Sequence, residues 1–346
     1  MGKVGHFVYR TKTIWRSFKE IYQLPQAKID AFVDSFEVFH HDFKDESRLK
    51  EAYGENYYEI VHQKVKDYYA VLNLVGSLGC VEKMYIPPMI DPKKSIAQNQ
   101  ELFEKRMMAD LQIKQGDKVL DIGCGRGRVA AHIARLKKAK VTGINIQEDQ
   151  LKHGRQFAKE KGLEDLLEFQ KGDLNDIPFP FPEETFDAIY HIQVFSYSKD
   201  LYKLMKELYR ILKPGGRVSS CDWLTLDAYD PNNKEHVFIV NKIKPLLGAI
   251  GTPSKAEYLD AFKQAGFKII KAEVAATPGK TDELNIEKAS KEFTLIHKLV
   301  NGLVKVRILP KHFKTILEQL KDAEVFAEVE RRKLATTNYH IVAEKV

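Results

Sequence analysis

Three glycines at alternate positions, Gly123, Gly125 and Gly127, are the residues whose spacing most directly indicates binding chemistry. They follow a short apolar segment, 118–122, and precede a stretch with helical periodicity. Glycines at a strand-to-helix turn let a ligand approach the backbone, and the start of the helix offers N–H groups to it. The spacing GxGxG is one residue shorter than the GxGxxG of dinucleotide sites, and Asp121 stands at the strand end. The pattern predicts a small-molecule site, with a nicotinamide site or a purely structural turn as the alternatives.

Polar side chains stand at the ends of the next three predicted strands, where an open α/β sheet binds its ligands. Asn145 follows the glycine loop by about twenty residues, the place of the residue that bonds ribose hydroxyls in a doubly wound fold. Asp173 can accept a hydrogen bond from the exocyclic amine of an adenine on which Leu174 packs, with the capping of a turn as the alternative. His191, Ile192 and Gln193 are candidates for contact with a substrate at the same edge.

An alternation of strand and helix patterns from Asp117 onward must position these side chains. Apolar runs bounded by Gly, Pro and polar residues predict strands at 118–122, 140–146, 167–171, 217–223, 267–275 and 336–344, and a fourth strand that begins with 186–190. Helical periodicity predicts helices at 129–136, 150–161, 201–212, 234–247 and 255–265. This alternation is typical of a doubly wound α/β sheet.

The region before the sheet is predicted to be helical. Aromatic residues at three- to four-residue spacing predict two amphipathic helices in residues 1–50, broken near Leu24-Pro25. We favour packing on the core or on a dimer partner for these helices, with membrane contact as the alternative. His40-His41-Asp42 is interpreted as a solvated segment, because adjacent helical positions point in different directions and do not share a metal ion. Further helices are predicted at 57–75 and 95–111.

Two other segments are expected to act as covers. The segment 84–88, Met-Tyr-Ile-Pro-Pro, favours an extended loop directly ahead of the first strand, so we expect it to lie as a lid across the glycine loop. Residues 283–332 form a charged helical insertion before the last strand. We interpret its apolar positions as cover for the sheet rather than as a lipid pocket, although both roles are compatible: Phe293, Ile296, Leu299, Leu303 and Val306.

The composition is that of a soluble globular protein: 346 residues, 44% hydrophobic and 30% charged. A net charge of +7 is spread along the chain without the basic stripe of a nucleic-acid-binding protein. Three cysteines without a CxxC pair argue against a zinc site and against a disulfide framework. There is no apolar run of 18 residues and no signal-peptide pattern, so the expected location is cytoplasmic, with peripheral membrane association as the alternative.

Five ordered motifs resemble the class I S-adenosylmethionine (SAM)-dependent methyltransferases over residues 117–223. They are the GxGxG loop, the polar end of the second strand, Gly172-Asp173, Phe186-Asp187 and Leu212-Lys-Pro-Gly-Gly216. The resemblance implies a Rossmann-like, seven-stranded sheet with helices on both faces, SAM as cofactor and S-adenosylhomocysteine as product. The cofactor-binding residues it implies are Tyr68, Asp121, Gly123, Cys124, Gly125, Gly127, Asn145, Ile146, Gln150, Gly172, Asp173, Leu174, His191 and Gln193.

A narrower resemblance covers residues 60–346. Tyr68-Tyr69, Asp222-Trp223, the segment 229–236 and Thr337-Asn-Tyr339 are similar to the sterol methyltransferase family, which transfers a methyl group to carbon in a sterol. The implied acceptor is a sterol or a related hydrophobic terpenoid, and the candidate catalytic residues are Tyr69, His191 and His236, the histidines as general bases. In this comparison Gln193 stands where the family has an acid.

Two other functions remain open from the sequence. One is methylation of a small polar metabolite on N, O or S, and the other is a non-catalytic protein with the SAM-binding fold. The expected organisation is a helical N-terminal lid (1–110), a SAM-binding core (111–282), a helical insertion over the substrate (283–332) and the last core strand (333–346). The expected partner is a small-molecule or lipid substrate, with peripheral membrane contact and a homodimer as further alternatives, and neither a metal nor a nucleic acid is expected.

Overall fold

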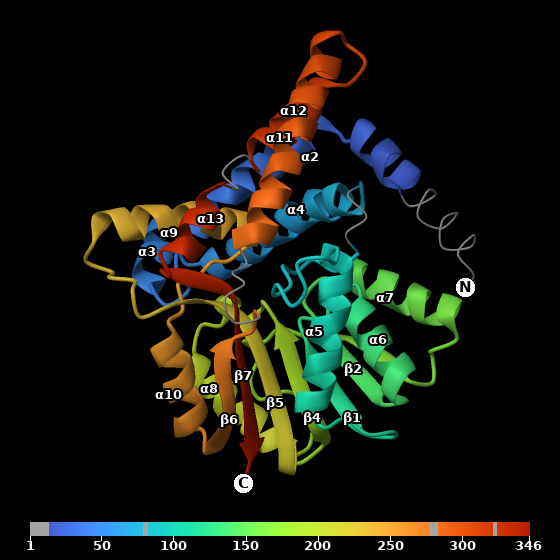
Figure 1. The fold of residues 1–346 in the computed structure, drawn as a ribbon, viewed down its shortest axis with the longest axis vertical. Helices are drawn as coiled ribbons and strands as arrows, with labels where there is room; N and C mark the ends of the chain where they lie inside the picture. The colour runs from blue at the N-terminus through green and yellow to red at the C-terminus, as the bar shows by residue number, and fades with distance from the viewer. Residues whose placement is uncertain (1–13, 79–81, 277–282, 321–323) are drawn as a thin grey trace. The chain divides into compact units, whose positions relative to one another are not determined.

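A computed structural model describes residues 14–78, 82–276, 283–320 and 324–346 (Figure 1). Contacts between residues divide the chain into two compact units. The sheet unit comprises Tyr85–Tyr229, Thr252–Asp282 and Arg332–Val346, and the helical unit comprises Met1–Met84, Asp230–Gly251 and Glu283–Arg331. The first boundary therefore falls at residue 84 rather than at 110, and residues 230–251, which we expected in the core, belong to the helical unit.

The sheet unit is built on seven strands: β1 (Lys118–Ile122), β2 (Lys140–Asn145), β3 (Leu167–Lys171), β4 (Phe186–Ile192), β5 (Leu212–Thr225), β6 (Phe267–Val274) and β7 (Ala335–Lys345). Their order in the sheet is β3-β2-β1-β4-β5-β7-β6. The first five strands in this order are parallel, whereas β7 runs antiparallel to both β5 and β6. The strand order reverses between β1 and β4, so ligands are expected at the carboxyl ends of these two strands.

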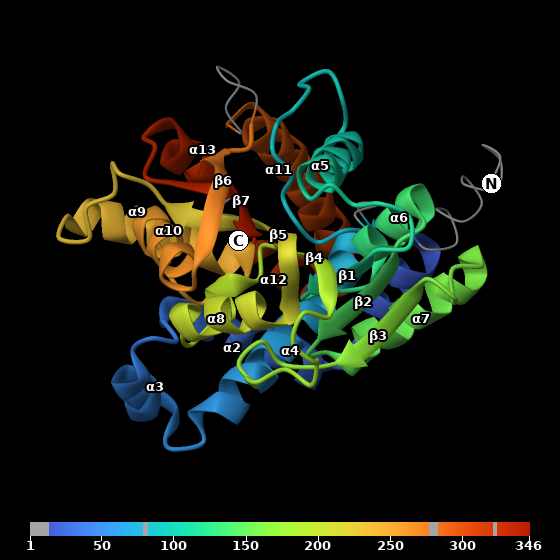
Figure 2. The same cartoon turned by 90° about the horizontal axis from the view of Figure 1, so that it is seen from below.

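Helices cover both faces of this sheet (Figure 2). They are α5 (Ile96–Asp110), α6 (Arg128–Lys137), α7 (Glu148–Lys161), α8 (Leu201–Ile211) and α10 (Lys255–Gln264). Apolar side chains of α5, α6 and α7 form one core with Val119 of β1 and Phe169 of β3. Those of α8 and α10 form another core with Leu120 of β1 and Ile189 of β4. The Rossmann-like, seven-stranded fold expected from the sequence is confirmed.

The helical unit contains a helix at 14–22, α2 (Gln26–Ser35), the 3₁₀ helix η1 (Phe36–His40), α3 (Glu46–Tyr53), α4 (Tyr57–Leu78), α9 (Lys234–Leu247), α11 (Glu283–Lys305), α12 (Lys311–Glu318) and α13 (Glu324–Arg331). The expected break near Leu24-Pro25 is present, and Pro25 stands at the N-cap of α2. Aromatic rings form much of the core: Phe39 lies 4.7 Å from Tyr68 between centroids, and Phe36 lies 5.4 Å from it. No helix in the described ranges is both long and apolar enough to cross a bilayer.

The insertion before the last strand differs from our expectation. Its helices, α11 to α13, belong to the helical unit and contact each other there. Ile296, Leu299 and Val306 are 50%, 62% and 63% exposed, so these side chains do not cover the sheet. Leu303 is half-buried, and the side chain of Phe293 lies outside the described residues. The periodic pattern identified an apolar helix face correctly, but it carried no information about what covers that face.

Candidate active site at the carboxyl edge of the sheet

The glycine loop joins β1 to α6, and its three glycines have different reasons for lacking a side chain. Gly123, Gly125 and Gly127 have φ of +71°, +53° and +68°, values that L side chains rarely adopt. A Cβ at Gly123 would lie 2.5 Å from Val194, and one at Gly127 would lie 2.3 Å from the Phe169 ring. At Gly125 the nearest atom is an oxygen of the Gln150 side chain, at 3.4 Å. Gly123 and Gly127 are therefore required for packing, whereas Gly125 leaves the backbone open to a ligand.

Asp121 lies directly before this loop and is buried. It accepts a 2.6 Å hydrogen bond at Oδ2 from the hydroxyl of Tyr190 on β4. Burial raises the pKa of Asp121 to about 7, the Tyr190 hydrogen bond opposes this shift, and the charge of Glu104 adds to it. Burial also raises the pKa of the neighbouring Cys124 thiol well above its usual value, which keeps it from acting as a thiolate nucleophile. A cation close to Asp121 would favour the ionised carboxylate.

A chain of half-buried amides follows β2. Asn145 Nδ2 donates to Gln150 Oε1 at 2.9 Å, and Gln150 Nε2 donates to Gln147 Oε1 at the same distance. Asn145 Nδ2 also lies 3.5 Å from the carbonyl oxygen of Gly125, so the end of β2 is next to the glycine loop. Ile146 is half-buried beside them. These amides hold donors and acceptors at the position where the sequence predicts ribose recognition.

The third predicted position lies at the end of β3. Gly172 donates its N–H to the carbonyl oxygen of Asn145 at 3.1 Å, which brings the two strand ends together. Asp173 Oδ1 accepts from the backbone N–H of Asn175 at 2.9 Å, the turn-capping role that was the alternative for this residue. Leu174 is half-buried against the core on the α8 side of the sheet. Binding of an adenine by Asp173 and Leu174 stays a prediction.

Gln193 directly follows β4 and has a left-handed backbone conformation, φ +56°. Its Oε1 accepts from the N–H of Ile86 at 3.1 Å, and its Nε2 donates to the carbonyl oxygens of Ile86 and Thr337, both at 2.9 Å. The amide thus joins the segment 85–91 to the starting end of β7. The segment we expected across the glycine loop is bonded to Gln193, at the end of β4.

Sequence reasoning missed the other side chains that hold residues 85–91, which we call the strap. Asn99 Oδ1 accepts from the backbone N–H groups of Ile90 and Asp91, at 3.1 and 2.8 Å. Gln100 Nε2 donates to the carbonyl oxygen of Tyr85 at 3.0 Å, and the Tyr85 hydroxyl donates to Glu104 at 2.7 Å. These three residues of α5, Asn99, Gln100 and Glu104, are buried although they are polar. Polar residues on the buried face of a predicted helix need hydrogen-bond partners, and this was the signal in the sequence that could have identified them.

The structure corrects the assignment of His191 as a base and as a cofactor ligand. The sequence placed it on the fourth strand at the carboxyl edge of the sheet, but β4 continues to Ile192, and His191 pairs in register with Ile122 and Ser220. It is fully buried, its Nε2 lies 2.6 Å from Ser220 Oγ, and its ring stacks on Phe195. Burial lowers its pKa well below 6.5. A side chain with no exposed surface does not reach an acceptor, so His191 is a packing residue.

The tyrosine pair lies on α4 in the helical unit. Tyr68 is fully buried, and its hydroxyl donates to the carbonyl oxygen of Pro245 at 2.8 Å. Its hydroxyl is therefore engaged within the helical unit, and its contact with the cofactor stays a prediction. Tyr69 is half-buried, edge-on to Tyr68 at 5.1 Å, and its catalytic role stays a prediction.

His236 lies in the first turn of α9. Asn233 caps this helix, and the Oδ1 atom of its side chain accepts from the N–H groups of Glu235 and His236. The half-buried ring of His236 accepts at Nδ1 from the N–H of Asp230 at 3.1 Å. This hydrogen bond fixes the proton of a neutral ring on Nε2. His236 stays a candidate for proton transfer. No group of three or more metal-ligating side chains occurs in the part of the chain that the structure describes.

Comparisons with known proteins agree with this geometry. The methyltransferase domain family matches residues 120–220. Cycloartenol-C-24-methyltransferase from Arabidopsis thaliana is 29% identical over 324 residues, 90% of this chain and 93% of that protein. A sterol 24-C-methyltransferase from Gibberella zeae is 34% identical and covers 70% of this chain and 69% of its own. A geranyl diphosphate methyltransferase structure with SAM has a TM-score of 0.56, 19% identity, and coverage of 76% of this chain and 98% of its own.

The fold and the site define a class I methyltransferase that uses SAM as its cofactor. Within this class the chain belongs to the sterol methyltransferase family. The residues at the sheet edge fit a cationic cofactor that carries a nucleoside. Gly125 leaves the backbone accessible, the amides of Asn145 and Gln150 can exchange their mutual hydrogen bond for ribose hydroxyls, and Asp121 is a carboxyl group whose ionisation a cation would favour.

Proposed function

We propose that this protein transfers a methyl group from SAM to a sterol or a related hydrophobic terpenoid. One observation carries the proposal: the similarity to the Arabidopsis cycloartenol methyltransferase spans 90% of this chain and 93% of that protein. It therefore extends well beyond the domain at 120–220, which binds the cofactor and is shared by enzymes with different acceptors. Parts of the chain outside that domain would also contact the acceptor, and these parts are included in the match.

Within this proposal the residues of the chain have separate tasks. The cofactor supplies the methyl group as an electrophile, so the protein has to position the acceptor and exclude water. Gly125, Asn145 and Gln150 would hold the cofactor, and Asp121 would stabilise its positive charge. The strap is held by Gln193 at its first residues and by Asn99 at its last residues, and would form a fixed wall on the acceptor side. His236 would take the proton that leaves the acceptor.

A second candidate, methylation of a small metabolite on N, O or S, is favoured by one observation. Methylation of an alkene passes through a carbocation, which a carboxylate stabilises. At the position of the family's acid this chain has Gln193, a neutral amide whose three hydrogen bonds go to backbone groups. An acceptor with a lone pair on N, O or S would not need that carboxylate.

A transfer assay distinguishes the two functions. The full-length protein is incubated with SAM that carries a tritiated methyl group and with two panels, sterols and linear terpenoids in one, and amines, phenols and thioethers in the other. We expect label in the organic extract with the first panel only. Label in amines or thioethers without any transfer to a terpenoid would refute the proposal. The Gly125→Val variant serves as the cofactor-deficient control, and calorimetry with SAM and S-adenosylhomocysteine tests the non-catalytic alternative, which predicts binding without turnover to any acceptor.

A further inference from the structure

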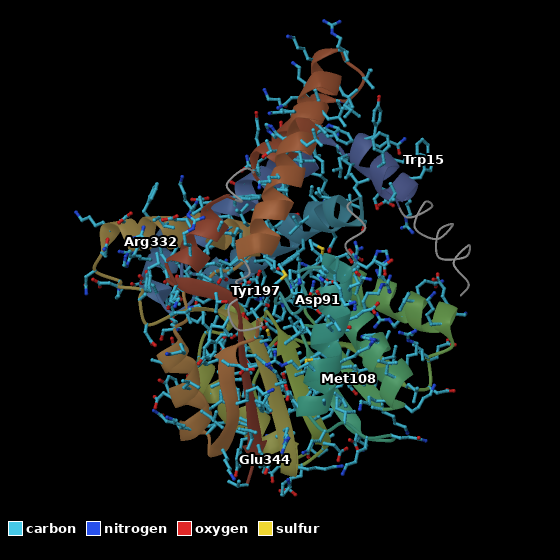
Figure 3. All side chains as sticks on the ribbon, in the orientation of Figure 1. Trp15, Asp91, Met108, Tyr197, Arg332 and Glu344 are labelled. Atoms are coloured by element: carbon cyan, nitrogen blue, oxygen red, sulfur yellow. The ribbon has the colours of Figure 1, made fainter. Side chains whose placement is uncertain are left out.

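Exposed apolar side chains gather on neighbouring elements of the helical unit. Trp15 is 68% exposed on the helix at 14–22, and Figure 3 shows it projecting from that helix. On α11 and the turn that follows it, large apolar side chains are 50 to 70% exposed: Leu295, Ile296, Leu299, Val306 and Ile308. Isolated exposed apolar residues are ordinary, but a group of this size on consecutive turns of a helix marks an interaction surface.

The helix at 14–22 and α11 are linked through α12. The ring of Phe18 lies 5.7 Å from that of Phe313 on α12, and Tyr22 lies 6.4 Å from Phe313. His312 Nε2 lies 2.8 Å from the carbonyl oxygen of Ile21. Because α12 also packs against α11, the three helices form one assembly within the helical unit. We call its exposed part, residues 14–22 with 294–314, the apolar-basic surface.

The apolar residues of α11 fall on one side of the helix. At 100° per residue, Leu295, Ile296 and Leu299 lie within an arc of about 100°, and the half-buried Leu303 lies in the same arc. A stripe of this kind normally faces a core. Here the stripe is exposed, and nothing in the part of the chain that the structure describes covers it.

Basic side chains predominate around the stripe, and the acidic Glu20 of the helix at 14–22 is paired with Arg16 at 2.8 Å. Residues 294–317 contain five basic side chains and no acidic one: Lys298, Lys305, Arg307, Lys311 and Lys314. All five are exposed, and Lys314 lies 3.5 Å from Glu318. Within the described residues the other four have no ion-pair partner. The apolar-basic surface therefore combines aliphatic side chains, an exposed tryptophan and a positive field.

We infer that the apolar-basic surface docks the protein on an anionic lipid bilayer. Aliphatic side chains of an interfacial helix enter the acyl boundary, tryptophan prefers the headgroup level, and Lys and Arg contact anionic headgroups through long flexible stems. A second copy of this chain would bring like charges together, so a symmetric dimer through this surface is disfavoured. The inference concerns adsorption to a membrane and does not depend on which acceptor the enzyme methylates.

The two tryptophans make a direct test, because Trp15 is 68% exposed and Trp223 is 2% exposed. The protein is titrated, without SAM or sterol, with vesicles of phosphatidylcholine alone and of phosphatidylcholine mixed with phosphatidylserine. We expect a blue shift of the emission and quenching by brominated lipid with the anionic vesicles. Trp15→Phe should remove both signals while the protein still sediments with the vesicles. An emission spectrum that stays constant while wild-type protein remains in the supernatant would refute the inference.

Paired variants separate the two contributions to binding. Lys305→Gln with Arg307→Gln should weaken adsorption to anionic vesicles roughly thirtyfold, since each basic residue near such a surface contributes a factor of about five. Leu295→Ser with Leu299→Ser should reduce the affinity and the quenching. The matched controls are Lys159→Gln with Lys206→Gln, exposed on the sheet unit, and Phe238→Ser, 60% exposed on α9, which should bind like wild type.

Two results of these variants would overturn the inference. One is equal loss of adsorption in the controls and in the variants of the apolar-basic surface. The other is a concentration-dependent dimer in sedimentation velocity that the leucine variants abolish, with no adsorption of wild type to vesicles, since the stripe would then be covered by a second copy. Failure of the terpenoid assay leaves the vesicle measurements unaffected, so the two proposals can fail separately.

Discussion

Gln193 holds Ile86 by both of its backbone polar groups, accepting from its N–H at 3.1 Å and donating to its carbonyl oxygen at 2.9 Å. The side-chain amide thereby makes the two backbone hydrogen bonds that a neighbouring strand would make to an extended residue. A carboxylate can only accept hydrogen bonds. The amide at this position is thus specifically suited to holding the strap.

Replacing Gln193 by Glu should therefore impair use of the acceptor more than cofactor binding. The variant loses the donations to Ile86 and Thr337 and places a negative charge beside two carbonyl oxygens. We expect kcat/KM for the acceptor to fall at least about tenfold, with an unchanged Kd for SAM in calorimetry. Gln156→Glu, on the exposed face of α7, is the matched control. Equal losses in both parameters would mean that Gln193 contacts the cofactor instead.

Substitutions of two glycines in the loop should affect different properties: Gly127→Ala the stability of the fold, and Gly125→Val the binding of SAM. Gly127→Ala places a Cβ against the Phe169 ring at a left-handed backbone position, which should cost at least about 2 kcal/mol of unfolding free energy. Gly125→Val carries backbone strain at φ +53° but meets only the flexible end of Gln150, so it should lose less unfolding free energy than a variant with the Phe169 clash, and it should fail to bind SAM. Urea unfolding and calorimetry on both variants check this. Normal SAM affinity in Gly125→Val would place the cofactor elsewhere.

Cofactor affinity should rise with pH through about 7. Asp121 has its pKa raised to about 7 by burial, so below this pH a cationic cofactor must bind at the cost of removing a proton. Tyr190→Phe deletes the hydrogen bond that stabilises the ionised form, and should move the midpoint to higher pH. Calorimetry in buffers of different ionisation enthalpy would detect the released proton. A flat profile, or one that persists in Asp121→Asn, would exclude Asp121 as the titrating group.

Lys244 of α9 should make the helical unit more stable at alkaline pH. It is buried, its Nζ donates to the carbonyl oxygen of His41 at 2.9 Å, and burial lowers its pKa to about 8. Between about pH 8 and 10.5 the unfolded chain keeps a proton that the folded chain has lost, so stability from this group rises with pH.

The matched variant for that effect is Lys244→Met, which lacks the titrating group. The difference in unfolding free energy between wild type and Lys244→Met should move in favour of wild type by up to about 3 kcal/mol across this window. Denaturant titrations at several pH values supply the comparison. A constant difference would show that the ammonium is hydrated in the folded state.

Of the two candidate histidines, His191 is fully buried and His236 is half-buried. His236→Ala is therefore the variant that tests proton transfer. If His236 accepts the proton of the acceptor, the substitution should lower kcat about a hundredfold with SAM affinity unchanged. Single-turnover rates measured against pH provide the check, since a base leaves a titration that disappears in the variant. His191→Ala should instead lower the melting temperature, because it leaves a cavity beside Phe195.

The sheet and the cofactor loop could be predicted because their signals are local. The apolar runs 118–122 and 167–171 are bounded by polar or glycine residues, and both strands have the predicted limits. The glycine spacing reports directly on backbone conformation, and all three glycines have positive φ. These features depend on residues that are close together in the sequence, where steric rules decide the structure.

The acceptor side of the site could not be predicted in the same way. Gln193 and Ile86 are 107 positions apart, and Gln193 and Thr337 are 144 apart, so no local pattern links them. His191 was misplaced because both faces of a central parallel strand are buried, and composition does not tell the last buried position from the first exposed one. For α11 the period of the pattern gave the helix and its apolar face, but the partner of that face is set by tertiary structure.

The position of β7 has a consequence for the order in which the protein can be assembled. Among the described strands β6 pairs with β7 alone, and β7 lies between β6 and β5. During translation β6 leaves the ribosome some sixty residues before β7, so it has no strand to pair with at that point. The edge of β5 that later pairs with β7 is also unpaired until then. Residues 335–345 must therefore be available before the facing edges of β5 and β6 can both be paired.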